Sequence, residues 1–399
     1  MTAALEPAGR PESRWVLSRT AWLYLLVLVL AVGAAQRLGD GAYRLLWAPS
    51  GPIDLGIYHT LVHRWFAGDP VYDVRGATYP PASVALLWPL VGWLPFGAAR
   101  GLWAVTTAAA LAWLVILVVR ESLARSRLQR VAVALVPLAI YATRAVIVNG
   151  QVALYLLPAL ITGLLLLDRR RPGWGRDLGA AALILPSLVK PTVAAPFLWL
   201  VILARGWLRP TLLIGLGYLA LTIAAAAFQP ASLVTLIRQW LASAVSVAAL
   251  ASLQAHANLH SWLAWLGLDA LNAPVSLLAL GMLGWWLYCH RQEDIWIRLG
   301  VAALAARFWS FHYRYDDVLI LVPMIALLRL TEQRPWADGA RTTARALLVL
   351  TAVTMLAPAR LLFLAWPWTA LVETAQTTVW LGVLAFLCSP TWRERGRAR

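Results

Sequence analysis

The amino-acid sequence predicts an all-α, polytopic membrane protein with about 12 transmembrane helices. Three observations indicate this class. Hydrophobic residues make up 61% of the 399 residues and charged residues only 13%, and the mean hydropathy is +0.70. Apolar runs of about 20 residues, which match the hydrocarbon thickness of a bilayer, follow one another almost to the end of the chain. The basic residues gather in short loops between these runs, whereas a soluble domain carries more charge throughout.

The net charge of +16 does not indicate a nucleic-acid-binding protein, because of how the charge is distributed. Arginines cluster in short segments of the kind that a membrane protein keeps on its inner side. The 23 tryptophans also suit a membrane protein, since their rings favour the interface. We therefore expect membrane lipids, and no nucleic acid, among its partners. The arginine-rich segments are 120–130, 168–177, 205–209, 329–345 and 393–399.

The first apolar run, 20–36, is expected to be a retained helix with the N-terminus, 1–19, in the cytoplasm, because Arg10, Arg14 and Arg19 flank it. A cleaved signal peptide is the alternative, since "AVGAAQ" resembles a cleavage site. Cysteines do not help to define the fold. Cys289 and Cys388 lie far apart in apolar segments, so they indicate neither a disulfide framework nor a zinc site, and we interpret them as small core residues.

The first outer loop is expected at 37–97. It contains a short run, 80–95, that is interrupted by prolines. If this run crossed the membrane, the arginines of 120–130 would fall on the outer side, against the positive-inside rule. We therefore interpret 80–95 as an outer-face or half-inserted element, and 98–119 as the second full span.

The remaining runs alternate across the membrane as parts of one domain, 1–399. The run 178–204 is broken by "PSLVKP" between basic flanks, so we interpret it as two short helices that dip to the outer side at Lys190. A second outer segment is expected at 229–272, and the basic tail, 389–399, returns to the cytoplasm. The other expected spans are 131–148, 152–167, 211–228, 274–288, 295–309, 318–330, 346–365 and 368–388.

This topology places most of the unexplained polar residues on one side of the membrane. Ionisable residues near a membrane interface are costly unless they are partnered, so their convergence indicates a functional site. The residues that come out at an outer helix end or in an outer loop are Asp54, Asp69, Asp73, Asn149, Gln151, Lys190, His260, His312, Arg314, Asp316 and Asp317.

Asp54 precedes "YHTLVHRWFAG", in which Tyr58, Val62, Trp65 and Phe66 recur at helical spacing. This pattern predicts an amphipathic helix at the membrane interface. We interpret Asp54 in one of two ways. Either it caps this helix, or it acts as a general base. A carboxylate near a low-dielectric boundary has a raised pKa, which suits a general base.

Lys190 lies inside an apolar run, where a lysine costs roughly 2.5 to 3.5 kcal/mol at the bilayer centre. Pro186 and Pro191 break the helix around it. At an outer helix end its ammonium is free for an anion, and we favour phosphate or pyrophosphate binding over snorkelling to the interface.

Four further motifs carry weaker signals. "TYPP", which contains Tyr79, and "NGQ", which contains Gln151, fit plain structural turns, although Gln151 at a helix start is also able to bond a ligand. "WSFHYRYDD" fits a loop ion-pair cluster. It also fits the binding of a sugar phosphate, with Arg314 and His312 on the anion and aromatic rings such as that of Tyr315 against the sugar. Further hydrogen bonds are expected from "HANLHSWLAWLG", through Asn258, His260 and Ser261.

Cofactor motifs are not recognisable in the sequence. The six histidines are scattered, without HExxH or a closely spaced acid triad, so no metal is expected. Neither a P-loop nor a dinucleotide-binding glycine motif occurs, so a nucleotide-sugar donor is unsupported.

The order of these motifs resembles that of the integral-membrane GT-C glycosyltransferases, specifically family 87, the polyprenyl-phosphate-mannose-dependent group. The resemblance covers about 20–330. It starts with Asp54, Tyr58 and "AGDPVYD", and continues through "YPP", "GQ", the lysine–proline pair, "NLHS" and the histidine segment before "LILVP".

The resemblance implies inverting transfer of a sugar, with mannose expected, from a polyprenyl-phosphate donor to a lipid or glycan acceptor, without metal or nucleotide. Asp54 matches the presumed general base, and Lys190, Arg314 and His312 are then expected to stabilise the leaving phosphate. The substrate-binding residues expected with them are Tyr58, Tyr79, Gln151, Asn258, His260 and Tyr315. The segment "SFHYRYDD" departs from the family pattern of a serine–proline followed by paired histidines, which affects the role of His312.

Two other functions remain open from the sequence. A transporter or lipid flippase would use the broken helices and Lys190 along a midplane route, but it would place polar residues near span centres rather than at outer ends. A non-catalytic subunit for assembly of envelope polymers would not need Asp54. The favoured expectation is an enzyme of the bacterial cytoplasmic membrane whose active site faces outward.

Overall fold

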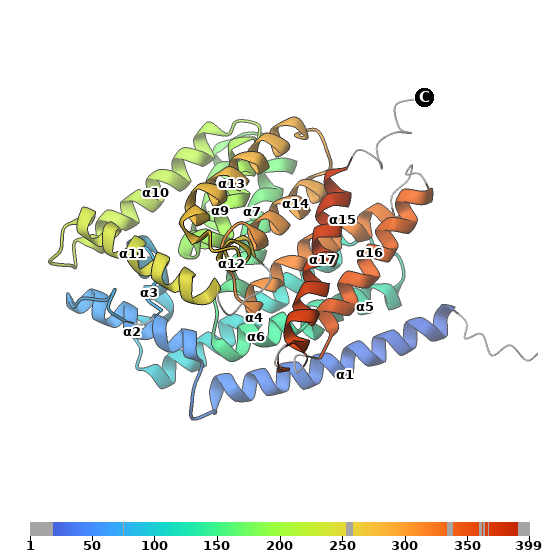
Figure 1. Cartoon of the computed structure of the whole chain (residues 1–399), viewed down its shortest axis with the longest axis horizontal. Coiled ribbons are helices and arrows are strands. Elements are labelled where there is room, and N and C mark those ends of the chain that lie inside the picture. The colour runs from blue at the N-terminus through green and yellow to red at the C-terminus, as the bar shows by residue number, and fades with distance from the viewer. Residues whose placement is uncertain are drawn as a thin grey trace, which may run out of the picture.

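The computed structural model describes residues 19–74, 76–252, 258–332, 338–358, 361, 364–365 and 367–389. Within these residues the protein is helical throughout and contains no strand (Figure 1). Apart from Arg19 and Ser389, the predicted N-terminal segment and basic tail lie outside the described residues. The all-α prediction is confirmed.

Helix α1, Arg19–Leu46, is 28 residues long and continues ten residues past the predicted end at Gln36. Its polar residues find partners on the protein, which allows the helix to continue. Arg37 donates to the carbonyl oxygens of Leu356 and Ala357, and Asp40 pairs with Arg144 of helix α6 at 2.5 Å. The segment 37–46 therefore belongs to a helix rather than to a loop, and α1 runs along one edge of the molecule (Figure 1).

Helix α2, Ile53–Ala67, confirms the helix predicted after Asp54, but its surroundings differ from the prediction. Tyr58, Val62 and Trp65 are completely buried in the protein, and Trp65 Nε1 donates to the carbonyl oxygen of Ala225 at 2.8 Å. The apolar face of α2 therefore packs on the protein instead of lying on lipid. The N-cap residue is Pro52 and no side chain caps the helix, so the capping interpretation of Asp54 is wrong.

The two proline-rich runs form short helices, which were predicted for 178–204 but not for 80–95. Helix α3, Pro81–Val91, has 11 residues, too few to cross a bilayer. The second run comprises helix α8, Trp174–Ile184, the 3-10 turn η1, Leu185–Val189, and helix α9, Pro191–Ile202. Pro191 has no N–H group and restricts Lys190 to extended backbone, so the chain breaks at Lys190.

Short, buried helices fill the centre of the bundle. Helix α7, Ala153–Arg169, and helix α14, Ile295–Phe308, are buried along nearly their whole length. Helix α14 packs against α9 and against helix α15, Leu321–Glu332, and α7 packs against α8. Because lipid does not surround them, these helices need not match the thickness of a bilayer.

The structure is that of a multi-pass membrane protein, but the twelve predicted passes are not shown. A sixth crossing exists if α5, Arg127–Ala139, and α6, Tyr141–Asn149, which are bent by 44°, form one span. Several predicted passes are the short central helices. The five helices of the described residues that are long and apolar enough to cross a membrane are α1, α4 (Phe96–Glu121), α10 (Leu208–Ala226), η2 with α13 (Asp269–Cys289) and α17 (Trp368–Cys388).

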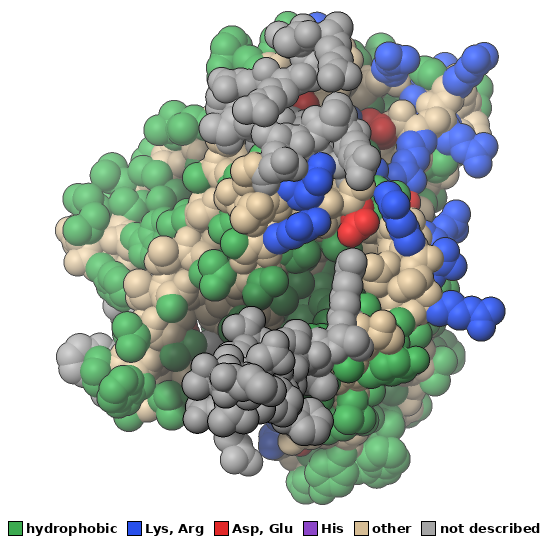
Figure 2. All heavy atoms as spheres, turned by 90° about the vertical axis from the view of Figure 1, so that its right-hand side faces the viewer, with side chains coloured by type: hydrophobic (Ala, Val, Ile, Leu, Met, Phe, Trp, Pro, Cys, Tyr) green, Lys and Arg blue, Asp and Glu red, His purple; other side chains and the backbone are tan. Residues whose placement is uncertain are grey.

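The remaining helices lie in the second predicted outer segment and in the C-terminal part of the chain. The segment 229–272 contains helix α11, Leu233–Ser252, and helix α12, Leu259–Trp265. The 3-10 turn η3, Arg314–Ile320, leads into α15, and helix α16, Asp338–Leu356, precedes α17. Figure 2 shows Lys and Arg side chains gathered over one part of the face it presents and hydrophobic side chains over much of the rest.

Candidate active site

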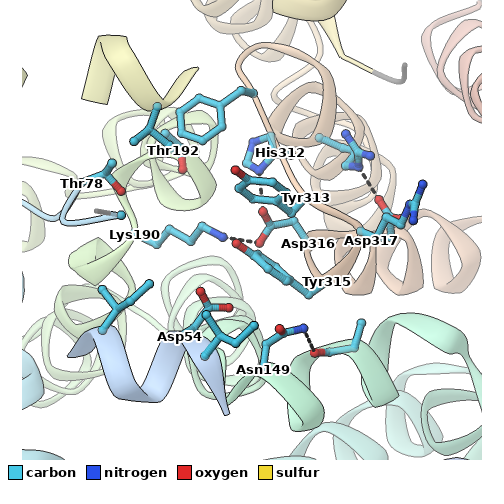
Figure 3. Close-up of a pocket in the computed structure, with 18 of the residues that line it drawn as sticks. Asp54, Thr78, Asn149, Lys190, Thr192, His312, Tyr313, Tyr315, Asp316 and Asp317 are labelled. Atoms are coloured by element: carbon cyan, nitrogen blue, oxygen red, sulfur yellow. Dashed lines mark hydrogen bonds and ion pairs between the residues drawn. The ribbon is translucent and has the colours of Figure 1, made fainter. Parts of the chain in front are cut away.

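A cavity of about 1090 Å³ lies among segments from most of the chain. Its walls come from the ends of α1 and α2, the loop before α3, α6, the η1–α9 junction, α11, the 311–317 segment and α17. Figure 3 shows Asp54 and Asn149 on one side of the cavity, with Lys190, Tyr315 and Asp316 facing them. The predicted site residues that line it are Asp54, Tyr79, Lys190, His312, Arg314 and Tyr315.

Asp54 lies in the first turn of α2 and is half-buried at the cavity wall. Its position depends on a close contact with the end of α6. Gly150 adopts φ +68° there, and a Cβ atom on it would lie only 2.6 Å from the Cβ atom of Leu55. Glycine is therefore required for the approach of α6 to the residue that follows Asp54.

Burial raises the pKa of Asp54 to about 6, although the Gln151 amide and the Lys190 charge lower it. A carboxyl group with a pKa near 6 is ionised at neutral pH and is still basic enough to accept a proton. Asp54 therefore has the protonation behaviour of a general base.

Tyr58, Tyr79 and Gln151 form a hydrogen-bonded chain next to Asp54. Tyr58 Oη donates to Gln151 Oε1 at 2.8 Å and lies 2.9 Å from Tyr79 Oη. Because the single proton of Tyr58 goes to Gln151, Tyr79 donates to Tyr58. Burial raises the pKa of Tyr58 and of Tyr79, which keeps both hydroxyl groups protonated.

The members of this chain differ in their access to the cavity. Tyr79 lines it, whereas Tyr58 and Gln151 are buried and do not. Tyr58 and Gln151, which were both predicted to bind substrate, therefore lie behind the cavity wall. There they contact residues that face the cavity.

Lys190 pairs with Asp316, and Asp316 pairs with His312. Lys190 Nζ lies 2.6 Å from Asp316 Oδ1, and His312 Nδ1 lies 3.0 Å from Asp316 Oδ2. The Nζ atom also lies 4.6 Å from the ring centroid of Tyr315. The prediction of a free Lys190 ammonium is therefore wrong for this state, because a cation that is largely removed from water needs a partner.

Burial and neighbouring charges determine the ionisation of Asp316 and His312. Although burial raises the pKa of Asp316, the Lys190 charge and His312 hold it well below its usual range. Burial lowers the pKa of His312, which Asp316 partly offsets. Asp316 is thus a permanent anion that keeps Lys190 in place at the cavity wall.

A second cation of the predicted site is also paired. Arg314 Nη2 lies 2.6 Å from Glu373 Oε1, a buried carboxylate of α17. Next to it, Asp317 accepts hydrogen bonds from Arg307 and from Tyr141 Oη. Arg314 is thus held by a helix that lies 59 residues away in sequence.

Asn258 and His260 do not line the cavity. Asn258 caps α12 by accepting from the Ser261 N–H group at 3.0 Å, and His260 Nε2 lies 2.8 Å from Ser276 Oγ. Burial and the neighbouring His312 lower the pKa of His260 to about 4, so its ring is neutral at pH 7. These residues support the wall near His312.

Several lining residues were not predicted from the sequence. Glu373 and Gln376 of α17 had a usable signal, since an acid and an amide inside the apolar run 368–388 are costly without partners. No such signal marked Arg44 and Arg144, which line the cavity and both bond to Asp40. Five lining residues are basic, Arg44, Arg144, Lys190, Arg307 and Arg314, and four are acidic, Asp54, Asp316, Asp317 and Glu373.

These charges suit a negatively charged substrate. With these nine groups ionised, the lining carries one more positive than negative charge. Apolar side chains, among them Ile53, Ile57 and Val247, line the same cavity. In the described part of the chain, His, Cys, Asp and Glu side chains do not assemble in groups of three or more that could hold a metal ion.

A known family matches the chain, over a region that leaves out Asp54, His312, Arg314 and Tyr315. The model of glycosyltransferase family 87 matches residues 77–306, more than half of the chain. No curated protein and no solved structure matches the chain significantly. The matched region contains Tyr79, Gln151, Lys190 and His260 in the order that the sequence analysis found. The protein is a membrane glycosyltransferase, and it belongs to glycosyltransferase family 87.

Proposed function

We propose that the protein catalyses inverting transfer of a sugar, with mannose expected, from a polyprenyl-phosphate donor. The acceptor is a lipid or glycan on the outer face of the bacterial cytoplasmic membrane. The observation that carries this proposal is Asp54, a carboxylate with a pKa of about 6, at the wall of a large cavity lined by basic and apolar side chains.

In the proposed reaction, Asp54 accepts the proton of an acceptor hydroxyl group as its oxygen attacks the anomeric carbon. The bond between that carbon and the phosphate oxygen breaks on the opposite side, which inverts the configuration. The polyprenyl phosphate leaves with the bonding electron pair, and its charge grows by one. Cations already in position around the leaving phosphate stabilise this charge most strongly in the transition state.

Lys190 and Arg314 are the cations that we assign to the phosphate. Both line the cavity, and each forms an ion pair with a carboxylate that also lines it. Lys190 turns from Asp316 to the phosphate, while His312 continues to hold Asp316. The apolar part of the lining, which includes Ile53 and Ile57, accommodates the start of the polyprenyl chain.

The test is sugar transfer by purified protein in detergent, with radiolabelled polyprenyl-phosphate mannose and candidate acceptors. Asp54→Asn is expected to lower the rate by about 10² to 10⁴-fold, because the amide cannot accept the proton. Asp73→Asn is the matched control, since Asp73 is exposed, pairs with Arg64 and does not line the cavity. Its rate should equal that of the wild type.

Two results would contradict the proposal. Equal transfer by the wild type and Asp54→Asn would exclude Asp54 as the base. Absence of transfer with every polyprenyl-phosphate sugar would exclude the donor class and favour the transporter or flippase alternative.

A further inference from the structure

A second pocket lies at the junction of α7 and α8, in one of the arginine-rich segments that the topology places on the inner side. Its volume is about 590 Å³. The cavity described above shares no residue with it. It is lined by Leu166, Arg169, Arg170, Arg171, Gly175 and Arg176.

Two of the four arginines have no acidic partner. Arg169 Nη2 lies 2.5 Å from Glu121, and Arg176 lies 2.6 Å from Asp177. Arg170 and Arg171 are exposed and form no ion pair with the described residues. The pocket therefore carries an excess of two positive charges.

The backbone adds donors to the same pocket. Helix α8 begins at Trp174, and its N-cap residue, Gly173, has no side chain that could cap it. The first N–H groups of the helix, next to Gly175 in the pocket lining, have no partner within the helix and carry a partial positive charge. A helix start of this kind binds anions, and phosphates in particular.

A buried arginine forms part of the pocket wall. Arg176 is 6% exposed and lines the pocket. Its guanidinium is held by Asp177, to which Nε donates at 2.6 Å. Its Nη1 atom donates to the carbonyl oxygen of Arg205 at 2.9 Å, and this bond links the start of α8 to the segment that contains Arg205.

Exposed apolar side chains occur on α8, which begins at the pocket, and at the residue before α10. Trp174 is 63% exposed, Leu178 51% and Trp207 46%. The Arg209 guanidinium lies 4.4 Å from the ring centroid of Trp174. Tryptophan and arginine together are typical of the headgroup level of a membrane, where apolar rings meet phosphates.

We propose that this pocket binds the phosphate headgroup of an anionic phospholipid. Arg170 and Arg171 supply the charge, the start of α8 supplies backbone donors, and Trp174, Leu178 and Trp207 lie along the acyl chains. A soluble anion would make no use of the apolar surroundings, so the occupant is a lipid. This site is independent of the sugar-transfer reaction.

The experiment is native mass spectrometry of the full-length protein in a neutral detergent, titrated with phosphatidylglycerol. The wild type is expected to retain one or more molecules of phosphatidylglycerol and not of phosphatidylcholine. Arg170→Gln/Arg171→Gln should bind phosphatidylglycerol about tenfold more weakly, because each basic residue near the surface contributes to the attraction of anionic lipid.

The matched control is Arg120→Gln/Arg127→Gln, which removes two exposed arginines of a neighbouring arginine-rich segment outside the pocket. This variant should bind as the wild type does. Equal binding by the pocket variant, or an equal loss in the control, would overturn the proposal, since the affinity would then come from general surface charge. Inorganic phosphate at the same concentration should not displace the lipid, and displacement would show a site for a soluble anion instead.

Discussion

Lys190 and Asp316 form an ion pair across the cavity wall, with Nζ 2.6 Å from Oδ1, although they lie 126 residues apart in sequence. Asp316 is almost completely buried and Lys190 is 13% exposed. The lysine charge is therefore balanced before any substrate binds. A donor phosphate must compete with Asp316 for this ammonium, and His312 is in place to hold Asp316 when it does.

Replacement of Lys190 tests the ion pair. Lys190→Met should abolish transfer and destabilise the protein by about 3 to 5 kcal/mol, because it leaves a buried carboxylate without its cation. The double variant Lys190→Met/Asp316→Asn should regain most of the thermal stability and none of the activity. Thermal unfolding in detergent and the transfer assay measure both effects. If the double variant is as unstable as the single one, the two residues do not stabilise each other.

The pH dependence of transfer should follow the ionisation of Asp54. The base is active when deprotonated, and burial raises the pKa of Asp54 to about 6. The rate is therefore expected to be lost as the pH falls through about 6 and to reach a plateau above it. The measurement is kcat/KM of the wild type between about pH 4.5 and about pH 8. A rate that stays constant down to pH 5 would contradict a base with this pKa.

Gln151 is expected to tune Asp54 without touching substrate, and Tyr58 to hold Gln151 in place. Since the Gln151 amide lowers the pKa of Asp54, its removal should move the acid limb of the pH profile above 6. The double variant Gln151→Leu/Tyr58→Phe removes both partners of their hydrogen bond, and Tyr79, which loses Tyr58 as its acceptor, lines the cavity. The kcat should fall and KM should change little.

Tyr72→Phe is the control for this pair. It removes the hydrogen bond from Tyr72 Oη to the carbonyl oxygen of Tyr79 and does not alter the cavity lining. Its pH profile should keep the acid limb of the wild type. A higher KM in the Gln151→Leu/Tyr58→Phe variant, with an unchanged pH profile, would indicate contact with substrate instead.

Gly150→Ala should disturb the position of Asp54. The φ of +68° is unfavourable for alanine, and the new Cβ atom would lie 2.6 Å from Leu55 Cβ and 3.1 Å from Pro52 Cβ. The start of α2 must then move, so both transfer and thermal stability are expected to fall. Gly97→Ala is the control, because nothing lies within 4 Å of its added Cβ atom, and it should be neutral or slightly stabilising.

Several features of the site were predictable because they depend on neighbours in sequence. Pro186 and Pro191 predicted the break at Lys190, since Pro191 lacks an N–H group and disfavours helical backbone at the residue before it. The spacing of Tyr58, Val62 and Trp65 predicted α2, which places Asp54 in its first turn. Asp54, Lys190 and Arg314, which the sequence placed on one side of the membrane, line one cavity in the structure.

Other features were not predictable because they depend on distant segments. The end of α1 at Leu46 follows from the partners of Arg37 and Asp40 on other helices. The number of spans was not predictable, because a hydrophobic run alone does not distinguish a membrane-crossing helix from a short helix buried in a bundle.

The sequence by itself determined that this protein is an all-helical membrane protein, that the chain breaks at Lys190, and which residues carry charge in an apolar environment. These properties follow from composition, from proline and from local periodicity. Only the tertiary structure decided the partner of each charge: Gln151 for Asp54, Asp316 for Lys190 and Glu373 for Arg314. The physical reason is that burial and Coulomb attraction depend on distances in space, and the chain brings these residues together from segments far apart in sequence.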